Sequence, residues 1–343
     1  MRYRKLGRAG LIVSELSLGS NMFGGAGDPF WQDYGGLDQA AVNEVVATAV
    51  EGGVNFFDTA DGYTNGESEQ RLGQAIRDLN LDRTAIHICT KAGTQSGTGP
   101  NGCGGSRAHI LDACDKSLKR LGIDYIDVYL LHWFDPATPI DDTLRALDDL
   151  VRAGKVRYVG CSNFAAWEAM KAVGISERER FARFDAVQSR WSIATREIER
   201  ELVPFCRSEG LGIMAFGALL AGVLSGKYRR DGSSQQPGRF AGEVPALIDR
   251  ENTHDIIDVM REIARVHEVT PAEIAIAFLL REKAVCSIIV GSTKPEQIAA
   301  NLRASDIIMT DEEFGQLDAV SALPVDYGVS RTAPARIARQ QYL

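Results

Sequence analysis

The segment VNFFDTADGYTNGESEQRLGQAIRD, residues 54–78, contains the strand-and-helix unit that decides the fold. Its first five residues form a short apolar run, which predicts a buried strand that ends on an acid, Asp58. Tyr63 follows in a loop of Gly, Thr and Asn, and residues 66–78 then predict an amphipathic helix. The same unit recurs along the rest of the chain.

Eight apolar runs alternate with amphipathic segments. We predict strands at residues 15–20, 54–58, 85–91, 126–132, 156–163, 184–190, 211–216 and 287–292. We predict helices at residues 38–51, 66–78, 106–121, 141–153, 165–173, 196–209, 251–267, 271–283 and 295–303, and a last one that begins after Thr310. Buried strands that alternate with helices indicate a parallel sheet covered on both faces.

Eight such units in 343 residues predict a (β/α)₈ barrel in a single domain, residues 1–343, preceded by a hairpin within residues 2–16. The alternative is a doubly wound open sheet, but no GxGxxG motif follows the first strand, where a dinucleotide-binding half would carry it. Two long loops, residues 93–106 and 225–245, follow strand ends, on the face where such barrels hold their active sites.

Composition excludes several classes of function. The net charge is −8 with both signs mixed, which argues against a nucleic-acid surface, and no apolar run approaches the ~20 residues of a membrane span. The first residues lack the apolar core of a secretory signal. Six cysteines without a CxxC pair predict a reducing, cytoplasmic setting with no disulfide framework and no metal.

Polar side chains end three successive predicted strands. Asp58, Lys91 and His132 lie at the ends of the second, third and fourth strands, and Tyr63 lies just beyond the second. Neighbouring strands are ~4.8 Å apart, so we expect these four side chains to surround one point. Each has an ordinary structural explanation when taken alone, as a helix cap, a solvated lysine, a surface tyrosine or a core histidine. Their coincidence favours a site.

The residue types in this group suggest a carbonyl reduction. Lys91 is expected to lower the pKa of the Tyr63 phenol, and Asp58 to act as the counter-ion of Lys91. His132 can orient a substrate carbonyl, and Tyr63 can give a proton to the developing alkoxide. The hydride must come from a nicotinamide, because no side chain provides one. The alternative within a barrel is a Schiff base on Lys91, as in an aldolase.

Several segments together resemble the aldo-keto reductase family: NFFDTADGYTNGESEQRLGQAI, ICTKAG, LLHWFDPATPIDDTLRALDDLVRAGKVRYVGCSNF, IMAFGALLAGVLSGKY and VGSTKPEQIAANLRA. The similarity runs in unbroken order from about residue 1 to residue 320. It implies a barrel that binds a nicotinamide cofactor without a Rossmann domain, with Tyr63 as general acid/base. Because members of this superfamily also serve as regulatory subunits, a cofactor-binding subunit with little turnover is a second alternative.

The resemblance also implies the cofactor site. Ser162, Asn163 and Gln188 would hold the nicotinamide carboxamide, and Phe216 would stack on its ring. The turn Gly217-Ala218 stands where many relatives have Ser-Pro, near the pyrophosphate. The remaining cofactor residues that it implies are Gly19, Ser20, Asp58, Leu219, Gly222 and Lys227, with Gly291, Ser292, Thr293, Lys294, Gln297 and Asn301 around the adenosine.

The choice of cofactor depends on the last segment. Many relatives carry Arg or Lys at positions matching Gly291, Thr293 or Gln297 to grip a 2′-phosphate, and none is basic here. Lys294 remains close by, so we predict NADP rather than NAD. The residues TKPE also fit a capping box of Thr293 with Glu296 at a helix start.

The substrate is expected to be a small carbonyl compound or alcohol bound in an aromatic pocket. The aromatic residues beside the predicted catalytic group supply the candidates, which are Phe23, Trp31, Tyr63, Trp133 and Trp191. No nucleic-acid or membrane partner is expected.

Overall fold

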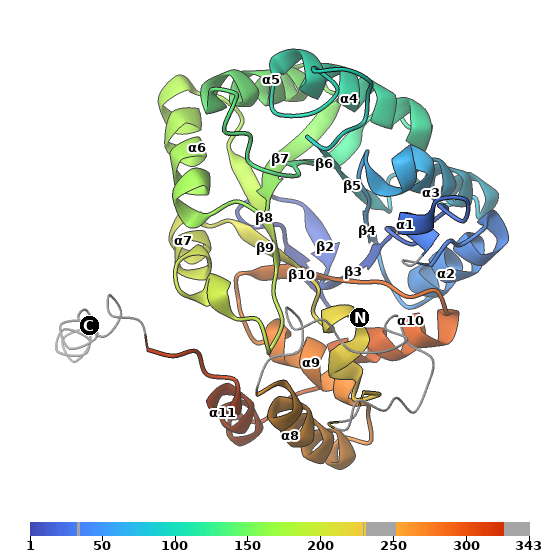
Figure 1. Cartoon of the computed structure of the whole chain (residues 1–343), viewed down its shortest axis with the longest axis vertical. Helices are drawn as coiled ribbons and strands as arrows, with labels where there is room; N and C mark the ends of the chain where they lie inside the picture. The colour runs from blue at the N-terminus through green and yellow to red at the C-terminus, as the bar shows by residue number, and fades with distance from the viewer. Residues whose placement is uncertain (33–34, 229, 231–251, 326–343) are drawn as a thin grey trace.

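The computed structural model describes residues 1–32, 35–228, 230 and 252–325. Eight parallel strands close into a barrel in the order β10-β3-β4-β5-β6-β7-β8-β9, as Figure 1 shows. They are β3 (Leu16–Gly19), β4 (Phe56–Asp58), β5 (His87–Ala92), β6 (Ile126–Leu131), β7 (Val156–Ser162), β8 (Phe184–Arg190), β9 (Gly212–Phe216) and β10 (Val285–Val290). The predicted (β/α)₈ barrel is therefore confirmed.

Helices surround this barrel, and those longer than four residues contribute buried residues to one core cluster with its strands (Figure 1). They are α1 (Pro29–Gln32), α2 (Gln39–Glu51), α3 (Glu67–Asp78), α4 (Arg107–Leu121), α5 (Ile140–Arg152), α6 (Ala166–Glu179), α7 (Leu202–Glu209), α8 (Thr253–Val266), α9 (Pro271–Leu280), α10 (Pro295–Leu302) and α11 (Asp311–Val320). Short 3₁₀ turns lie at η1 (Tyr63–Gly66), η2 (Glu197–Glu199), η3 (Leu220–Ser225) and η4 (Arg303–Asp306).

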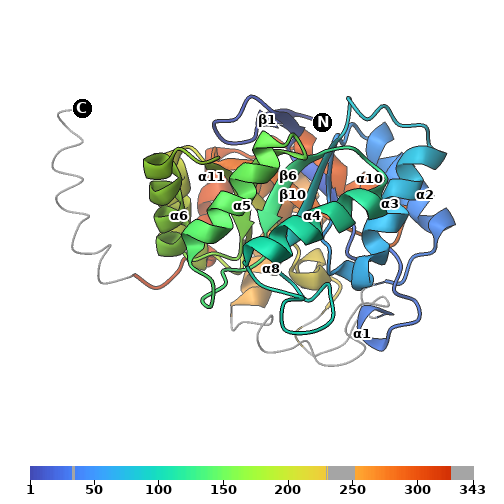
Figure 2. The same ribbon diagram turned by 90° about the horizontal axis from the view of Figure 1, so that it is seen from above.

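The predicted hairpin, formed by β1 (Tyr3–Lys5) and β2 (Ile12–Ser14), closes one end of the barrel. Leu6 and Val13 are fully buried and belong to the same cluster as the barrel residues Phe56 and Val128. At Gly7, φ is +56° and a Cβ would lie 2.4 Å from the Asp185 carbonyl oxygen, so only glycine fits this turn. Figure 2 shows the hairpin at one end of the barrel and α1 at the other, so a ligand must approach the α1 end.

Sequence signals placed most helix ends. Ser106 caps α4 through its side chain, Gly122 ends that helix at φ 68°, and Thr310 forms a capping box with Glu313 at the start of α11. Three predictions differ from the structure. The helix predicted at residues 165–173 is too short. In the structure α6 runs from Ala166 to Glu179, because its buried face continues through Ser176.

Two other predicted helices are too long. Residues 196–209 divide into η2 and α7, because the ring of Pro204 is incompatible with a helical carbonyl four residues earlier. The helix predicted over residues 271–283 ends at Leu280. Residue 229 and residues 231–251, which hold most of the predicted loop 225–245, lie outside the described residues.

Candidate active site

Four polar side chains meet at the open end of the barrel. Asp58 is the last residue of β4, Lys91 is the next-to-last residue of β5, and His132 follows β6 directly. Lys91 Nζ donates to Asp58 Oδ2 at 2.8 Å and to Tyr63 Oη at 3.2 Å. A third bond, 2.7 Å long, goes to the Thr59 carbonyl oxygen. The structure thus brings the predicted group together around the Lys91 ammonium.

Asp58 is held from the opposite side of the barrel as well. Gln188, near the end of β8, donates its Nε2 to Asp58 Oδ1 at 2.7 Å. Both carboxylate oxygens therefore have a partner, and Asp58 and Lys91 are 2 % and 0 % exposed. A buried ion pair with its remaining hydrogen-bonding groups satisfied has a fixed geometry. It holds the ammonium against the Tyr63 phenol.

Burial controls the proton on Tyr63. Burial raises the pKa of the Tyr63 phenol above 10, and this effect outweighs the Lys91 charge, which lowers it. The expected lowering of this pKa by Lys91 is thus present as a contribution, but the net direction is upward because desolvation of the phenol is the larger effect. Tyr63 is consequently a neutral phenol at neutral pH, with a proton to donate.

Lys91 is an ammonium. Burial by itself would lower the pKa of Lys91, but the pKa is raised above its usual value, chiefly because the Asp58 carboxylate stabilises the charged ammonium. A Schiff base requires a neutral amine with a free lone pair. The three bonds donated by Nζ leave no such lone pair, so the geometry disfavours the aldolase alternative.

His132 is a neutral imidazole beside the phenol. Burial and the Lys91 charge lower the pKa of His132 to about 3. Its ring lies edge to face with the Tyr63 ring, with centroids 5.7 Å apart, and it stacks on Trp133 at 5.5 Å. His132 Nδ1 is buried and has no hydrogen-bond partner among the described residues. The ring therefore keeps hydrogen-bonding capacity of its own next to Tyr63.

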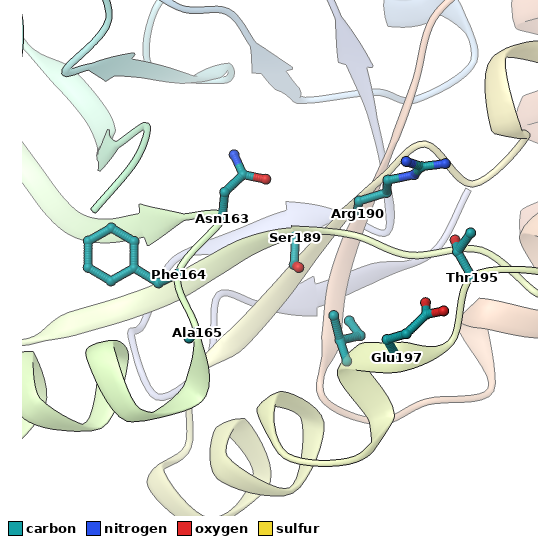
Figure 3. A pocket seen from close by; sticks show the side chains of 8 residues that line it. Asn163, Phe164, Ala165, Ser189, Arg190, Thr195 and Glu197 are labelled. Carbon is teal, nitrogen blue, oxygen red and sulfur yellow. The ribbon is translucent and has the colours of Figure 1, made fainter. Parts of the chain in front are cut away.

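The predicted carboxamide residues lie beside this group. Asn163 Nδ2 donates to Ser162 Oγ at 3.0 Å and to the His132 carbonyl oxygen at 3.2 Å. Asn163 has a left-handed φ of 58°, which Asn tolerates better than most residues, and its backbone N–H donates to the Gln188 carbonyl oxygen. Figure 3 shows Asn163 on a cavity of about 280 Å³, together with Ser189 and Arg190 of β8.

The strand β9 and η3 supply the next predicted residues. Phe216 ends β9 and is half-buried, followed by Gly217 at φ 72°, buried Ala218 and half-buried Leu219. Gly222 has φ 93°, and a Cβ there would lie 3.2 Å from Lys227 Nζ. The fold thus places the Lys227 ammonium beside the backbone of Gly222 in η3.

The predicted adenosine residues lie at the start of α10. Gly291, Thr293, Lys294 and Gln297 are exposed, and Asn301 is 7 % exposed. Ser292 Oγ donates to Gln297 Oε1 and accepts from the Lys294 N–H. The capping box of Thr293 with Glu296 is absent. It would require Thr293 as the N-cap, whereas α10 begins at Pro295 with Lys294 as its N-cap and no side-chain cap.

Two further predicted cofactor residues are packed at the end of β3. A Cβ at Gly19 would lie 2.8 Å from the Ile289 side chain, so β3 and β10 approach closely there. Ser20 Oγ donates to the Asp58 carbonyl oxygen at 3.0 Å, which links the end of β3 to the end of β4.

The predicted substrate residues separate into two groups. The Trp31 ring contacts Tyr63 edge to face, with centroids 6.1 Å apart, and Trp133 is 54 % exposed. Phe23 is fully buried, and Trp191 is 3 % exposed with Nε1 donating to Glu199 Oε1. Phe23 and Trp191 therefore belong to the core and offer little surface to a substrate.

Sequence reasoning missed two contacts of the site. The Thr59 carbonyl oxygen binds Lys91, and Gln188 binds Asp58 in addition to its predicted role. Neither carries a signal in the sequence, since one is backbone and the other depends on the width of the barrel. Within the described ranges no group of three His, Cys, Asp or Glu side chains could hold a metal ion. None of the described helices is long and apolar enough to cross a membrane.

Comparison with known proteins agrees with this geometry. The model of the Aldo/keto reductase family matches residues 15–322. The chain is 35% identical over 328 residues to a probable voltage-gated potassium channel subunit beta of Oryza sativa subsp. japonica, covering 93% of this chain and 96% of the relative. It is 33% identical to versiconal hemiacetal acetate reductase of Aspergillus parasiticus, with 93% and 96% covered. It is 30% identical to L-glyceraldehyde 3-phosphate reductase of Escherichia coli O157:H7, with 93% and 92% covered.

Proposed function

Because the chain belongs to the aldo/keto reductase family, an NAD(P)-dependent oxidoreductase family, we propose that it interconverts a carbonyl compound and an alcohol with Tyr63 as general acid/base. The observation that carries the proposal is the buried Lys91 ammonium, which bonds Asp58 and Tyr63 at once. This arrangement holds the hydroxyl of a neutral phenol at the strand ends through its bond to Lys91.

The residues of the site fit a nicotinamide dinucleotide. Asn163 and Ser162 offer an amide and a hydroxyl beside the catalytic group, as a carboxamide requires. Gly222 and Lys227 offer backbone and positive charge for a phosphate. The bound cofactor would supply the hydride.

The chain's own residues would manage the substrate oxygen. We assign to the neutral His132 imidazole a hydrogen bond to the substrate carbonyl oxygen, which orients the carbonyl next to the Tyr63 hydroxyl. As negative charge develops on that oxygen, Tyr63 transfers its proton to it. The Lys91 ammonium, 3.2 Å from Tyr63 Oη, then stabilises the phenolate that remains. In the reverse direction the same phenolate accepts the alcohol proton.

NADPH is the cofactor that we propose, since Lys294 is exposed at the predicted adenosine site and can bind a 2′-phosphate. The cytoplasmic location predicted from the cysteine pattern stays a prediction. A direct test is the decrease of absorbance at 340 nm when aldehydes and ketones are added with NADPH or NADH. Carbonyl-dependent oxidation of either cofactor supports the proposal, and its absence across the panel contradicts it.

A second candidate is a cofactor-binding subunit that regulates a partner with little turnover. The name of the Oryza sativa relative favours it, because that protein is called a probable potassium channel subunit. The complete group of Asp58, Tyr63, Lys91 and His132 favours turnover instead. Tight NADPH binding without carbonyl-dependent oxidation in the same assay would select the second candidate.

A further inference from the structure

We propose that Glu67 is a positioning residue that holds an aromatic flap, residues 24–31, over Tyr63 and so sets the selectivity among carbonyl substrates. The inference rests on the proposed function. The flap follows β3 and contains most of α1, with Phe30 and Trp31. Glu67 is the first residue of α3, four residues after Tyr63.

Glu67 bonds the flap and the helix at the same time. Its Oε2 accepts the Gly25 N–H at 2.7 Å, and its Oε1 accepts Arg71 Nε at 2.9 Å. A hydrogen bond from a backbone N–H to a carboxylate is stronger than one between neutral groups. Glu67 is fixed at the start of α3 by the helix backbone, so its bond to Gly25 attaches the flap to the helix that follows Tyr63.

Two glycines let the flap backbone pack closely against its neighbours. Gly24 and Gly25 have φ values of +75° and +81°, which favour glycine. A Cβ on Gly24 would lie 2.5 Å from the Glu67 carboxyl carbon, and one on Gly25 would lie 2.7 Å from the Trp31 Cβ and 2.8 Å from the Thr64 Cγ2. The flap backbone at Gly24 and Gly25 therefore packs directly against Glu67 and Thr64, and against Trp31 within the flap.

A second carboxylate attaches the flap to the loop of Tyr63. Asp28 Oδ1 accepts the Phe30 N–H at 2.9 Å, and its Oδ2 accepts Asn65 Nδ2 at 3.3 Å. Thr64 Oγ1 donates to the Phe23 carbonyl oxygen at 2.9 Å. Thr64 and Asn65 have left-handed φ values of 48° and 57°, a strain that persists only where surrounding contacts enforce it. Asp28 in the flap and Phe23, the residue before it, supply two of those contacts.

The consequence is a fixed aromatic wall beside the phenol. The Trp31 ring lies 6.1 Å from the Tyr63 ring, and Phe30 lies 5.1 Å from Trp31, edge to face. An aromatic carbonyl that reaches Tyr63 can pack against Trp31, whereas a three-carbon aldehyde has little surface to do so. Loss of the Glu67 bond should therefore penalise aromatic substrates selectively.

The test compares benzaldehyde with propanal in Glu67→Ala, Glu67→Gln and Arg71→Ala. In Glu67→Ala we expect kcat/KM for benzaldehyde to fall about fivefold, mainly through KM, with propanal within about twofold of wild type. Glu67→Gln should restore selectivity, because its amide oxygen can accept the Gly25 N–H. Arg71→Ala is the matched control: it removes the other partner of Glu67 and should leave the benzaldehyde preference in place.

A double variant tests whether Glu67 acts through Trp31. Trp31→Ala should lower benzaldehyde turnover by itself, and adding Glu67→Ala should change it by less than about twofold, since one unit is already disabled. Independent, additive losses would overturn the proposal. Equal losses for benzaldehyde and propanal in Glu67→Ala would overturn it as well.

Amide hydrogen exchange separates this inference from the proposed function. If the wild type reduces no carbonyl compound of the panel, the proposed function fails, and hydrogen exchange alone then tests whether Glu67 holds the flap. Exchange in residues 24–31 should be at least about tenfold faster in Glu67→Ala and unchanged in Arg71→Ala. Unchanged exchange in Glu67→Ala would mean that Glu67 does not hold the flap.

Discussion

Replacing Asp58 by Asn leaves the Lys91 ammonium buried without its counter-ion. Asn keeps the shape and can still accept from Gln188, so the principal loss is the charge 2.8 Å from Lys91 Nζ. Both groups are almost fully buried, and breaking such a pair costs about 3–5 kcal/mol. We therefore expect Asp58→Asn to lower the free energy of unfolding in urea by roughly that amount at pH 7.

The loss should depend on pH with a definite sign. Without Asp58, burial lowers the folded-state pKa of Lys91 below its unfolded value of about 10.4, so the unfolded chain binds more protons. Stability of the variant relative to wild type should then increase as pH rises from 7 toward 10. The double variant Asp58→Asn/Lys91→Met, which removes both charges, should recover most of the stability but no activity. An Asp58→Asn protein within about 1 kcal/mol of wild type would refute this account of the pair.

Three further outcomes follow from single residues. His132 has a pKa of about 3 in the folded chain and about 6.5 unfolded, so its contribution to stability is present above pH 6.5 and is lost as pH falls toward 3. Between pH 7.5 and pH 5, the unfolding temperature should therefore decrease less for His132→Gln than for wild type. Lys294→Ala should weaken NADPH about tenfold and leave NADH nearly unchanged in fluorescence titrations, and an equal loss for both would mean that Lys294 does not bind the 2′-phosphate. Gly222 has φ +93°, and the Cβ added by Gly222→Ala would lie 3.2 Å from Lys227 Nζ, so this variant should lose about 1–2 kcal/mol of stability and bind the cofactor more weakly. Gly10→Ala, with open space around its Cβ position, should change neither.

The barrel and the grouping of Asp58, Lys91 and Tyr63 in space could be predicted because each depends on local sequence. A strand such as Phe56–Asp58 is apolar up to its last residue, and the parallel register then fixes which strand ends are neighbours. Asp58, Lys91 and His132 follow from that register alone. The net direction of the Tyr63 pKa could not be predicted, since it depends on how strongly residues distant in sequence shield the phenol from water.

Residues outside the strand ends were harder to place. Trp191 and Phe23 are aromatic residues next to predicted functional positions, yet tertiary packing turns both into the core. The Glu67 contact with Gly25 spans 42 positions and lies in no repeating pattern. Predictions of helix ends were wrong where a single residue determined the end, as at Pro204 within the predicted helix 196–209.

The central claim is that Tyr63 gives its proton to the substrate oxygen, and Tyr63→Phe tests it most directly. General acid catalysis is commonly worth 10²–10⁴-fold, so kcat for carbonyl reduction should fall by roughly that factor. Cofactor affinity, measured by quenching of tryptophan fluorescence, should stay within a few fold, because the phenol acts only as charge develops. Lys91→Met should be comparably damaging, and the two losses should not add. A Tyr63→Phe protein that reduces carbonyls at a near-native rate would contradict the claim and make His132 the next proton donor to test.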